Sequence, residues 1–420
     1  MNLDEVVNLP FSVIDSCRVC GSRELSKSIS LGNLASCGFF PKTKTEQVGY
    51  GYLSLLVCNQ CGLVQLDRDF ETSSLFGLDY GYESKLNSSM VIHLNSLARE
   101  AYDYAHTSTS VKSILDIGSN DGTFLNWFVQ NGLKEITLVG IDPAIDQLAN
   151  NYSPEIIKVS NFFSGEILRD VLGEKIRFDL ITSIAMFYDL PDPNAFVKGI
   201  SELLEEKGTW IFELTTVETI ISSNAFDSIC HEHLEYYNIE AIEYLLGRHG
   251  LVIDQTKTSN ANGGSLRVYA KHRKNDESVY NGVSEINLEA ILNSLSKMKL
   301  DIDRNIEALK DFIHEQKRFG FEIHGLGAST KGNTFLQYAE MDYRDLPFIA
   351  EVNPIKFGCF TPGSLIPIVS EPESLKQNPS GYLALPWHFR ENLLLRNKEY
   401  IQNGGNLLFA LPSFDVVKGK

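Results

Sequence analysis

The chain has 420 residues, of which 43% are hydrophobic, and a formal net charge of −17 at pH 7. This length predicts about two or three domains with ordinary buried cores. So acidic a chain argues against nucleic-acid binding, since a nucleic-acid partner needs a basic surface. The first residues have neither a basic start nor an apolar core, and there is no apolar run of about 18 residues. We therefore expect no secretion signal and no membrane span, and a cytoplasmic protein.

Four cysteines near the start of the chain form two Cys-x-x-Cys pairs, Cys17/Cys20 and Cys58/Cys61, each followed by glycine. Four thiolates at the ends of two tight turns make the tetrahedral ligand set that Zn²⁺ prefers, with no position left open. We predict a structural zinc site in a module spanning residues 1–70. The pairs stand further apart than in an ordinary zinc ribbon. Two unrelated cysteine pairs, or a redox disulfide, are the alternatives.

Residues 71–110 are expected to connect this module to the next domain through a tyrosine-rich stretch and a helix at about 87–105. Residues 111–272 then alternate apolar runs with helical periods. Strands that alternate with helices predict a parallel sheet covered on both faces. The runs that we expect to form its strands are 113–117, 137–141, 178–182 and 208–212.

A glycine turn follows the first of these strands. Asn120 stands where a dinucleotide fingerprint has its second glycine, so the loop need not receive a pyrophosphate. A carboxylate at Asp116 suits the positively charged methionine end of S-adenosylmethionine (AdoMet), and Asp142, after the next strand, suits the ribose hydroxyls. A dinucleotide site and a turn without a ligand are the alternatives. The residues predicted to bind AdoMet are Asp116, Gly118, Ser119, Asn120, Gly122, Asp142, Pro143 and Met186.

A dense titratable cluster, His231, Glu232 and His233, follows the fourth predicted strand. Imidazole is the side chain whose ordinary pKa lies nearest neutrality, which suits a general base that removes a proton from carbon. We predict a catalytic role for all three residues, with a metal-binding pair or a structural network as alternatives. A later turn offers Asn262 and Arg267 as substrate contacts, Arg267 to an anion.

A polar linker and a long amphipathic helix at about 285–318 open the last predicted domain, 273–420. A second strand–glycine turn–helix unit follows from residue 321. Its turn places Ser329, Lys331 and Asn333 at a helix N-terminus, where backbone amides can hold a phosphate. We favour the diphosphate of a nucleotide sugar as the ligand. A packing turn without a ligand is the alternative.

Taken in order, these motifs resemble the AdoMet-dependent C-methyltransferases that act on nucleotide-linked 4-keto-deoxysugars. The matching segments are the zinc cysteines, Asp79-Tyr80-x-Tyr82, the loop 116–122, Glu232-His233, the Gly-Gly-Ser-x-Arg turn ending at Arg267, and residues 325–332. The resemblance implies an α/β chain with a small N-terminal zinc module, a class I methyltransferase Rossmann-like core and a second Rossmann-like C-terminal domain.

The resemblance also implies site roles. His233 would remove the proton beside the ketone, with C-3 as the expected carbon, and Glu232 and Tyr82 would assist while Tyr80 contacts the substrate. Relatives often carry Tyr and His where this chain has Cys230 and Asp189. The exact sugar and the auxiliary acid therefore stay open. The alternative functions are an O- or N-methyltransferase on a small metabolite, an NAD-dependent sugar enzyme, and a zinc-stabilised binding protein without catalysis.

Overall fold

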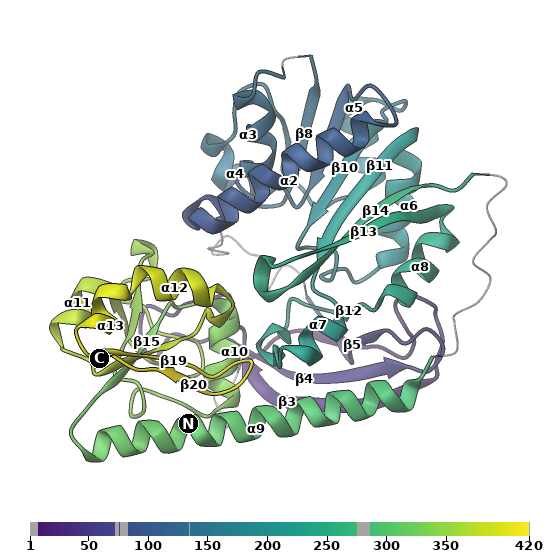
Figure 1. The fold of residues 1–420 in the computed structure, drawn as a ribbon. Coiled ribbons are helices and arrows are strands. Elements are labelled where there is room, and N and C mark those ends of the chain that lie inside the picture. Colours follow the sequence, from purple (N-terminus) through teal and green to yellow (C-terminus); the bar gives the residue numbers. More distant parts are fainter. Residues whose placement is uncertain (1–6, 72–74, 76–82, 134, 275–285, 420) are drawn as a thin grey trace.

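The computed structural model describes residues 7–71, 75, 83–133, 135–274 and 286–419, apart from the side chain of Asn262. The predicted site residues Tyr80 and Tyr82 lie outside the described residues. Figure 1 shows a core domain at the top, with an N-terminal module and a C-terminal domain side by side beneath it. No described helix has both the length and the apolar character that a membrane crossing requires.

The core domain is built on a seven-stranded sheet in the order β13-β14-β11-β10-β7-β8-β9. β14 runs antiparallel to both of its neighbours, and the strands from β11 to β9 are parallel. All four predicted strands are present. The strands are β7 (Ser113–Ile117), β8 (Thr137–Ile141), β9 (Ile157–Val159), β10 (Phe178–Ile184), β11 (Leu204–Leu214), β13 (Leu251–Ser259) and β14 (Ser265–His272). This is a class I methyltransferase sheet, as the sequence predicted.

Helices cover both faces of this sheet, which explains why its strands read as continuous apolar runs. In β7, Ile114 packs with the residues of one face and Leu115 with those of the other. One face is covered by α2 (Ser88–His106) and α3 (Thr123–Gln130), and the other by α5 (Gly165–Leu172), α6 (Pro193–Leu203) and α8 (Ile239–Arg248). The short helix α4 (Ile145–Leu148) follows β8.

The N-terminal module is a five-stranded sheet whose last strand comes from far along the chain. It consists of β1 (Val7–Asn8), β3 (Leu25–Ala35), β4 (Gly49–Cys58), β5 (Val64–Leu66) and β12 (Glu235–Tyr236). A separate pair joins β2 (Phe11–Val13) to β6 (Arg68–Phe70). β12 pairs antiparallel with β5, so the segment that carries the predicted catalytic cluster runs along the edge of the N-terminal sheet. No pattern in the sequence indicated this pairing.

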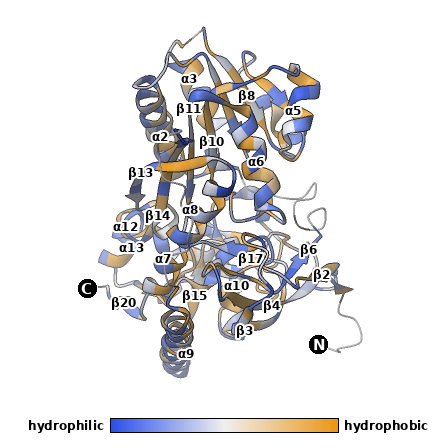
Figure 2. Cartoon of the chain, turned by 90° about the vertical axis from the view of Figure 1, so that its right-hand side faces the viewer, coloured by the Kyte–Doolittle hydropathy of each residue, from blue (hydrophilic) through white to orange (hydrophobic). Residues whose placement is uncertain are grey.

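The C-terminal domain begins with α9 (Leu288–Arg318), which runs beneath the N-terminal sheet and is seen nearly end-on in Figure 2. Its buried residues recur every third or fourth position, as an amphipathic helix requires; they are Leu295, Met298, Ile302, Ile306, Leu309 and Ile313. A six-stranded sheet follows in the order β17-β16-β15-β18-β19-β20. This is the Rossmann order, with β20 antiparallel.

The elements of this domain complete the fold. Its strands are β15 (Ile323–Leu326), β16 (Ile349–Glu351), β17 (Ile368–Ser370), β18 (Gly381–Ala384), β19 (Asn406–Phe409) and β20 (Asp415–Val417), and its remaining helices are α10 (Thr330–Tyr338), α11 (Glu371–Lys376), α12 (Arg390–Arg396) and α13 (Lys398–Gln402). Its hydrophobic core is continuous with that of the N-terminal sheet and includes Phe226, Ile229 and Leu234. The segment from α7 (Val217–Ser222) to β12 therefore leaves the core domain, to which the sequence assigned it, and packs with the other two parts.

Candidate active site

The carboxylate of Asp116 ends β7 at the glycine turn and is nearly inaccessible, with 4% of the residue exposed. Its Oδ1 accepts a hydrogen bond of 2.6 Å from the hydroxyl of Thr182 on the adjacent strand β10. Burial raises the pKa of Asp116 to about 7 against the effect of that hydrogen bond, and the nearby charge of Asp142 adds to the rise. A cationic ligand would relieve this penalty, so the site fits the ammonium and sulfonium groups of AdoMet.

Asp142, at the end of β8, lies beside the same turn. Its carboxylate accepts the backbone N–H of Asn120 at 3.0 Å and that of Ala144 at 2.7 Å. Gly118 has a left-handed backbone with φ of 71°, and a Cβ there would lie 2.9 Å from Cγ of Met186. The structure thus brings these predicted AdoMet residues together.

Three other predicted AdoMet residues border the loop. The Ser119 hydroxyl is 2.8 Å from that of Tyr152, and a Cβ at Gly122 would come within 2.6 Å of the same tyrosine ring. Pro143 is exposed and directly follows Asp142. Ser119 and Gly122 therefore both contact Tyr152, which supports the glycine turn. The sequence did not indicate this role for Tyr152.

His233 lies in the loop between η4 (Phe226–Ser228) and β12. Its Nδ1 is 2.7 Å from the carbonyl oxygen of Ser228. Because a carbonyl can only accept, Nδ1 carries the proton and Nε2 keeps a free lone pair. Burial lowers the pKa of His233 to about 4, the hydrogen bond to Ser228 opposes this, and the charge of Lys331 lowers the pKa further.

The loop after β10 joins the glycine turn to His233. Met186 in this loop lies against Gly118, and the Tyr188 ring packs edge-on against the His233 imidazole at 4.5 Å between ring centroids. The carbonyl oxygen of Tyr188 also accepts the backbone N–H of Leu234 at 2.8 Å. The loop after β10 therefore packs against both the glycine turn predicted to bind AdoMet (residues 116–122, called the methyl-donor loop below) and the predicted base His233.

In the sequence, buried acids directly adjoin His233 and its packing neighbour Tyr188: Glu232 precedes His233, and Asp189 follows Tyr188. Burial raises the pKa of Glu232, whose Oε2 has no hydrogen-bond partner among the described residues. Burial also raises the pKa of Asp189 well above its usual value, and the charges of Glu232 and Glu235 raise it further. The Cys230 thiol interacts with Glu232 as well. Asp189 and Cys230, where the resemblance led us to expect His and Tyr, thus both interact with the carboxyl group of Glu232.

His231 belongs to a different environment. Its ring is fully buried, its Nε2 lies 3.1 Å from the carbonyl oxygen of Gly51, and its edge packs on Phe70 at 4.9 Å between centroids. Both contacts come from the N-terminal module, so we assign His231 a packing role. Within the described residues, the four cysteines are the only group of three or more potential metal ligands, and the metal-binding alternative for this histidine pair gains no support.

The second glycine turn contributes a cation. Burial lowers the pKa of His233 and of His388 and raises that of Asp227, and the charge of Lys331 acts to lower the pKa of all three. Ser329 caps α10 by accepting the N–H of Gly332 at 3.0 Å. Asn333 is buried, and its side-chain amide donates to the carbonyl oxygen of Cys37 at 2.9 Å. Lys331 is thus the predicted substrate residue whose charge acts on the predicted base.

Two residues near Lys331 were missed by the sequence analysis. Asp227 is buried and accepts the indole N–H of Trp387 at 2.8 Å. His388 follows β18 and would lie 3.1 Å from a Cβ at Gly263, so the turn after β18 contacts the Asn-Gly-Gly turn of the core domain. Polar residues directly after a parallel strand lie at the ligand-binding edge of such sheets. That signal was available for His388.

Arg267 is fully engaged by carboxylates. Its Nε and Nη2 donate to Oε2 of Glu213 at 3.0 and 2.8 Å, and its Nη1 donates to Oε2 of Glu100 at 2.8 Å. His93 contacts the other oxygen of Glu213 at 2.6 Å. These bonds tie α2 to the sheet, and we therefore give Arg267 a structural role in place of the anion contact expected from the sequence.

The four zinc-ligand candidates converge, with all Sγ atoms within 4.8 Å of one another. The Cys17–Cys61 and Cys20–Cys58 sulfur distances are 3.5 and 3.4 Å. These exceed a disulfide bond of about 2.05 Å and approach the ~3.8 Å separation that Zn–S bonds of ~2.3 Å give around a tetrahedron. The arrangement fits a structural zinc ion and not a redox disulfide.

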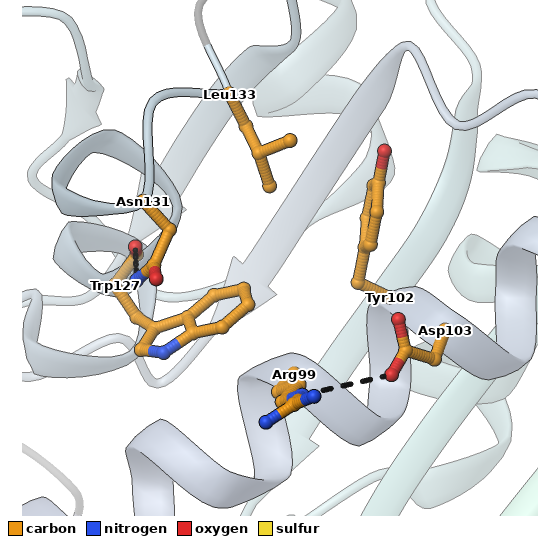
Figure 3. A pocket seen from close by; sticks show the side chains of 6 residues that line it. All are labelled: Arg99, Tyr102, Asp103, Trp127, Asn131 and Leu133. Carbon is orange, nitrogen blue, oxygen red and sulfur yellow. Dashed lines mark hydrogen bonds and ion pairs between the residues drawn. The ribbon is translucent and has the colours of Figure 1, made fainter.

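A surface pocket of about 340 Å³ lies elsewhere, between α2 and α3 (Figure 3). Its lining residues are Arg99, Tyr102, Asp103, Trp127, Asn131 and Leu133. None of them is a predicted site residue, and the exposed ion pair between Arg99 and Asp103 at its rim is 3.9 Å long. The pocket is open to solvent and we assign it no function.

Comparison with known proteins divides the chain as its fold does. Residues 17–76 match the model of a zinc-binding domain, residues 90–256 that of a methyltransferase domain, and residues 260–412 that of a C-methyltransferase C-terminal domain. The C-methyltransferase NovU of Streptomyces niveus is 27% identical over 417 residues, which cover 97% of this chain and 98% of the relative.

Two of the solved structures that match align with less than half of the chain. The plantazolicin methyltransferase BpumL in complex with SAH is 16% identical, with a TM-score of 0.34 over 44% of this chain and 85% of its own. The mitomycin 7-O-methyltransferase MmcR is 12% identical, with a TM-score of 0.36 over 44% of this chain and 55% of its own.

Proposed function

We propose that the chain methylates a carbon of a nucleotide-linked 4-keto-deoxysugar, at C-3. The proposal is supported by the match of its three parts, in order, to a zinc-binding domain, a methyltransferase domain and a C-methyltransferase C-terminal domain, and by its similarity to a C-methyltransferase over nearly the whole chain. AdoMet supplies an electrophilic methyl group when it is bound by the loop at Asp116 and by Asp142. The sugar class rests on the motif resemblance and on the pairing of a base for carbon with a cation for a diphosphate.

The hydrogen bond from His233 to Ser228 is the observation that carries this proposal. It fixes the proton on Nδ1, so that Nε2 is the atom that can accept a proton. A methyl transfer to oxygen or nitrogen needs less help of this kind, because those atoms already carry lone pairs. A neutral, oriented imidazole in a site with AdoMet favours carbon as the methyl acceptor.

Lys331 supports a coupling between substrate binding and the strength of the base. Burial lowers the pKa of His233 and the charge of Lys331 lowers it further, and an imidazole with so low a pKa is a weak base at neutral pH. A diphosphate bound by Lys331 would offset that charge and raise the pKa of His233 toward neutrality, where a general base is most effective. The nucleotide would thus activate His233 as it binds.

The proposed reaction has two steps. Nε2 of His233 takes the proton from the carbon next to the ketone, and the electron pair of the broken C–H bond delocalises onto the ketone oxygen as an enolate. The enolate carbon then forms a bond to the methyl group, the bond between that methyl and sulfur breaks, and the sulfur keeps the electron pair. Tyr82, which the resemblance places at the enolate oxygen, retains that role in the proposal.

The test uses His233→Ala with His314→Ala as a matched control, because His314 is an exposed histidine of α9 with 60% of its side chain accessible. The wild type, incubated with AdoMet and a panel of nucleotide-linked keto-deoxysugars, should add one methyl group to one of them by mass spectrometry. In D₂O without AdoMet, it should exchange deuterium into the same substrate.

We expect His233→Ala to lose both exchange and methylation and to keep AdoMet affinity in calorimetry, while His314→Ala behaves as the wild type. Turnover retained in His233→Ala would remove the base assignment. Methylation of a hydroxyl or amine in the product, located by NMR, would remove the carbon acceptor.

A further inference from the structure

Arg18 stands between two zinc ligands, Cys17 and Cys20, and its side chain is buried, with 3% exposed. Its Nη1 donates to the carbonyl oxygen of Leu66 at 2.9 Å, and its Nη2 to that of Arg68 at 3.0 Å. Nε donates to the Asp69 carboxylate at 2.9 Å. The guanidinium therefore fastens the first zinc knuckle to the end of β5 and to the β6 strand.

The same guanidinium reaches the segment that carries His233. Nη1 donates to the carbonyl oxygen of Leu234, the residue after His233, at 3.4 Å. Nε lies 3.6 Å from Oε1 of Glu235, a carboxylate whose side chain is fully buried. Neither oxygen of Glu235 has a hydrogen-bond partner among the described residues. Arg18 is thus the charge that compensates a buried carboxylate in β12.

β12 in turn holds His233. Glu235 pairs with Gln65 and Tyr236 with Val64 of β5, and the Tyr236 hydroxyl donates to the carbonyl oxygen of His233 at 3.0 Å. A shift of β12 away from β5 would carry the imidazole with it. Arg18 of the zinc knuckle therefore contacts the same short strand that is bonded to His233.

The knuckle is itself anchored to the core domain. Asn194 of α6 donates to the carbonyl oxygen of Arg18 at 2.8 Å, and Arg248 of α8 donates to that of Val19 at 2.6 Å. The buried cysteines Cys17, Cys58 and Cys61 pack in the same hydrophobic cluster as the core sheet. The first zinc knuckle thus contacts both the core domain, which carries the proposed AdoMet site, and the segment of β12 beside His233.

We propose that Arg18 is a positioning residue, which transmits the fixed geometry of the zinc knuckle through Glu235 and β12 to His233. The zinc site then sets the distance of the base from the methyl-donor loop as well as stabilising its own module. This inference rests on the proposed role of His233.

The test is Arg18→Met in the full-length zinc-loaded protein, with Arg23→Met as the control, because Arg23 follows the same knuckle with 81% of its side chain exposed. Five quantities are measured: zinc content, AdoMet affinity, kcat and KM for methylation, and the rate of deuterium exchange without AdoMet. A displacement of about 1 Å in a catalytic group can cost about 100-fold in rate.

We expect Arg18→Met to keep its zinc and its AdoMet affinity, and to lose about 100-fold in both kcat and exchange rate with a much smaller change in KM. Arg23→Met should match the wild type. Exchange and kcat at wild-type rates in Arg18→Met would overturn the proposal, as would loss of zinc together with activity, which would confine Arg18 to the metal site.

A second variant separates positioning from general damage. Burial raises the pKa of Glu235 well above its usual value, and the charge of Arg18 opposes this rise. Arg18→Met leaves this buried carboxyl group without its cation, so the double variant Arg18→Met/Glu235→Gln should regain part of the lost kcat. A double variant no better than Arg18→Met, or an insoluble pair, would overturn the proposal. If the wild type itself exchanges no deuterium, the proposed function has failed, and that result is distinct from a failure of Arg18.

Discussion

Asp116→Asn should make the protein without AdoMet more stable while weakening AdoMet binding. The carboxyl group of Asp116 has its pKa raised from 3.8 to about 7, chiefly by burial. Below pH 3.8 it is protonated in both the folded and the unfolded chain and costs nothing. Above that pH the unfolded chain ionises first, so the folded state loses stability until about pH 7, above which the whole penalty is present.

The size of the penalty follows from the two pKa values. At about 1.4 kcal/mol for each pH unit between them, it amounts to about 4 kcal/mol above pH 7. An asparagine keeps an oxygen to accept the Thr182 hydroxyl, but its buried NH₂ group costs about 1–3 kcal/mol if it finds no partner. The expected net gain in the free energy of unfolding is therefore about 1–3 kcal/mol at pH 8, and it should vanish or reverse near pH 4.

Urea unfolding of the protein without AdoMet at pH 4 and pH 8 measures this gain, and calorimetry measures AdoMet affinity. Loss of a charge-assisted bond to a cationic ligand should weaken binding by about 10- to 100-fold. Asp146→Asn is the control, because this exposed residue of α4 should change stability by less than about 0.5 kcal/mol. An Asp116→Asn protein that is equally destabilised at both pH values, or that binds AdoMet as tightly as the wild type, would refute the reasoning.

Three further outcomes are expected. A protonated imidazole cannot accept a proton, and burial lowers the pKa of His233 to about 4. We therefore expect kcat/KM to fall tenfold per pH unit below about pH 4 and not to depend on this group at higher pH. A fall in kcat/KM that begins near pH 7 would contradict this prediction. Cys58→Ser should release zinc, measured by atomic absorption, and should destabilise the N-terminal module; retained metal would argue against the four-cysteine site. Gly118→Ala and Gly132→Ala, both with left-handed backbones, should each lose about 1–2 kcal/mol of stability, but only Gly118→Ala should lose AdoMet affinity.

The local features of the fold were predictable from the sequence because each depends on neighbours in the chain. Apolar runs bounded by turns predicted β7 and β8 at their observed limits, and the spacing of apolar residues predicted α9, which begins at Leu288 and not at 285. The cysteine pairs and the glycine turn are likewise local patterns. Each requires a particular backbone conformation at a particular residue, such as a positive φ at Gly118.

The predicted catalytic cluster was less predictable because its segment, from α7 to β12, leaves the core domain and packs with the other two parts. Three adjacent titratable residues looked alike in the sequence, yet the backbone turns the His231 ring toward Gly51 in the N-terminal module and hydrogen-bonds the His233 ring to Ser228. Arg267 looked like a free anion contact until Glu213 and Glu100 were seen to surround it. Which partner a charged side chain takes depends on residues that are distant along the chain.

By itself, the sequence determined that this protein has a zinc module, a methyl-donor loop and a titratable cluster, because residue types at fixed short spacings limit the chemistry that a segment can perform. Only the tertiary structure decided that β12 joins the N-terminal sheet and that the charge of Lys331, in the C-terminal domain, helps to lower the pKa of His233. It also decided that Arg18 donates a hydrogen bond to the carbonyl oxygen of Leu234, next to His233. These contacts join residues far apart in sequence, and ordering them costs chain entropy. Two hydrophobic clusters offset that cost: one joins the N-terminal sheet to the C-terminal domain, and the other joins the zinc knuckles to the core sheet.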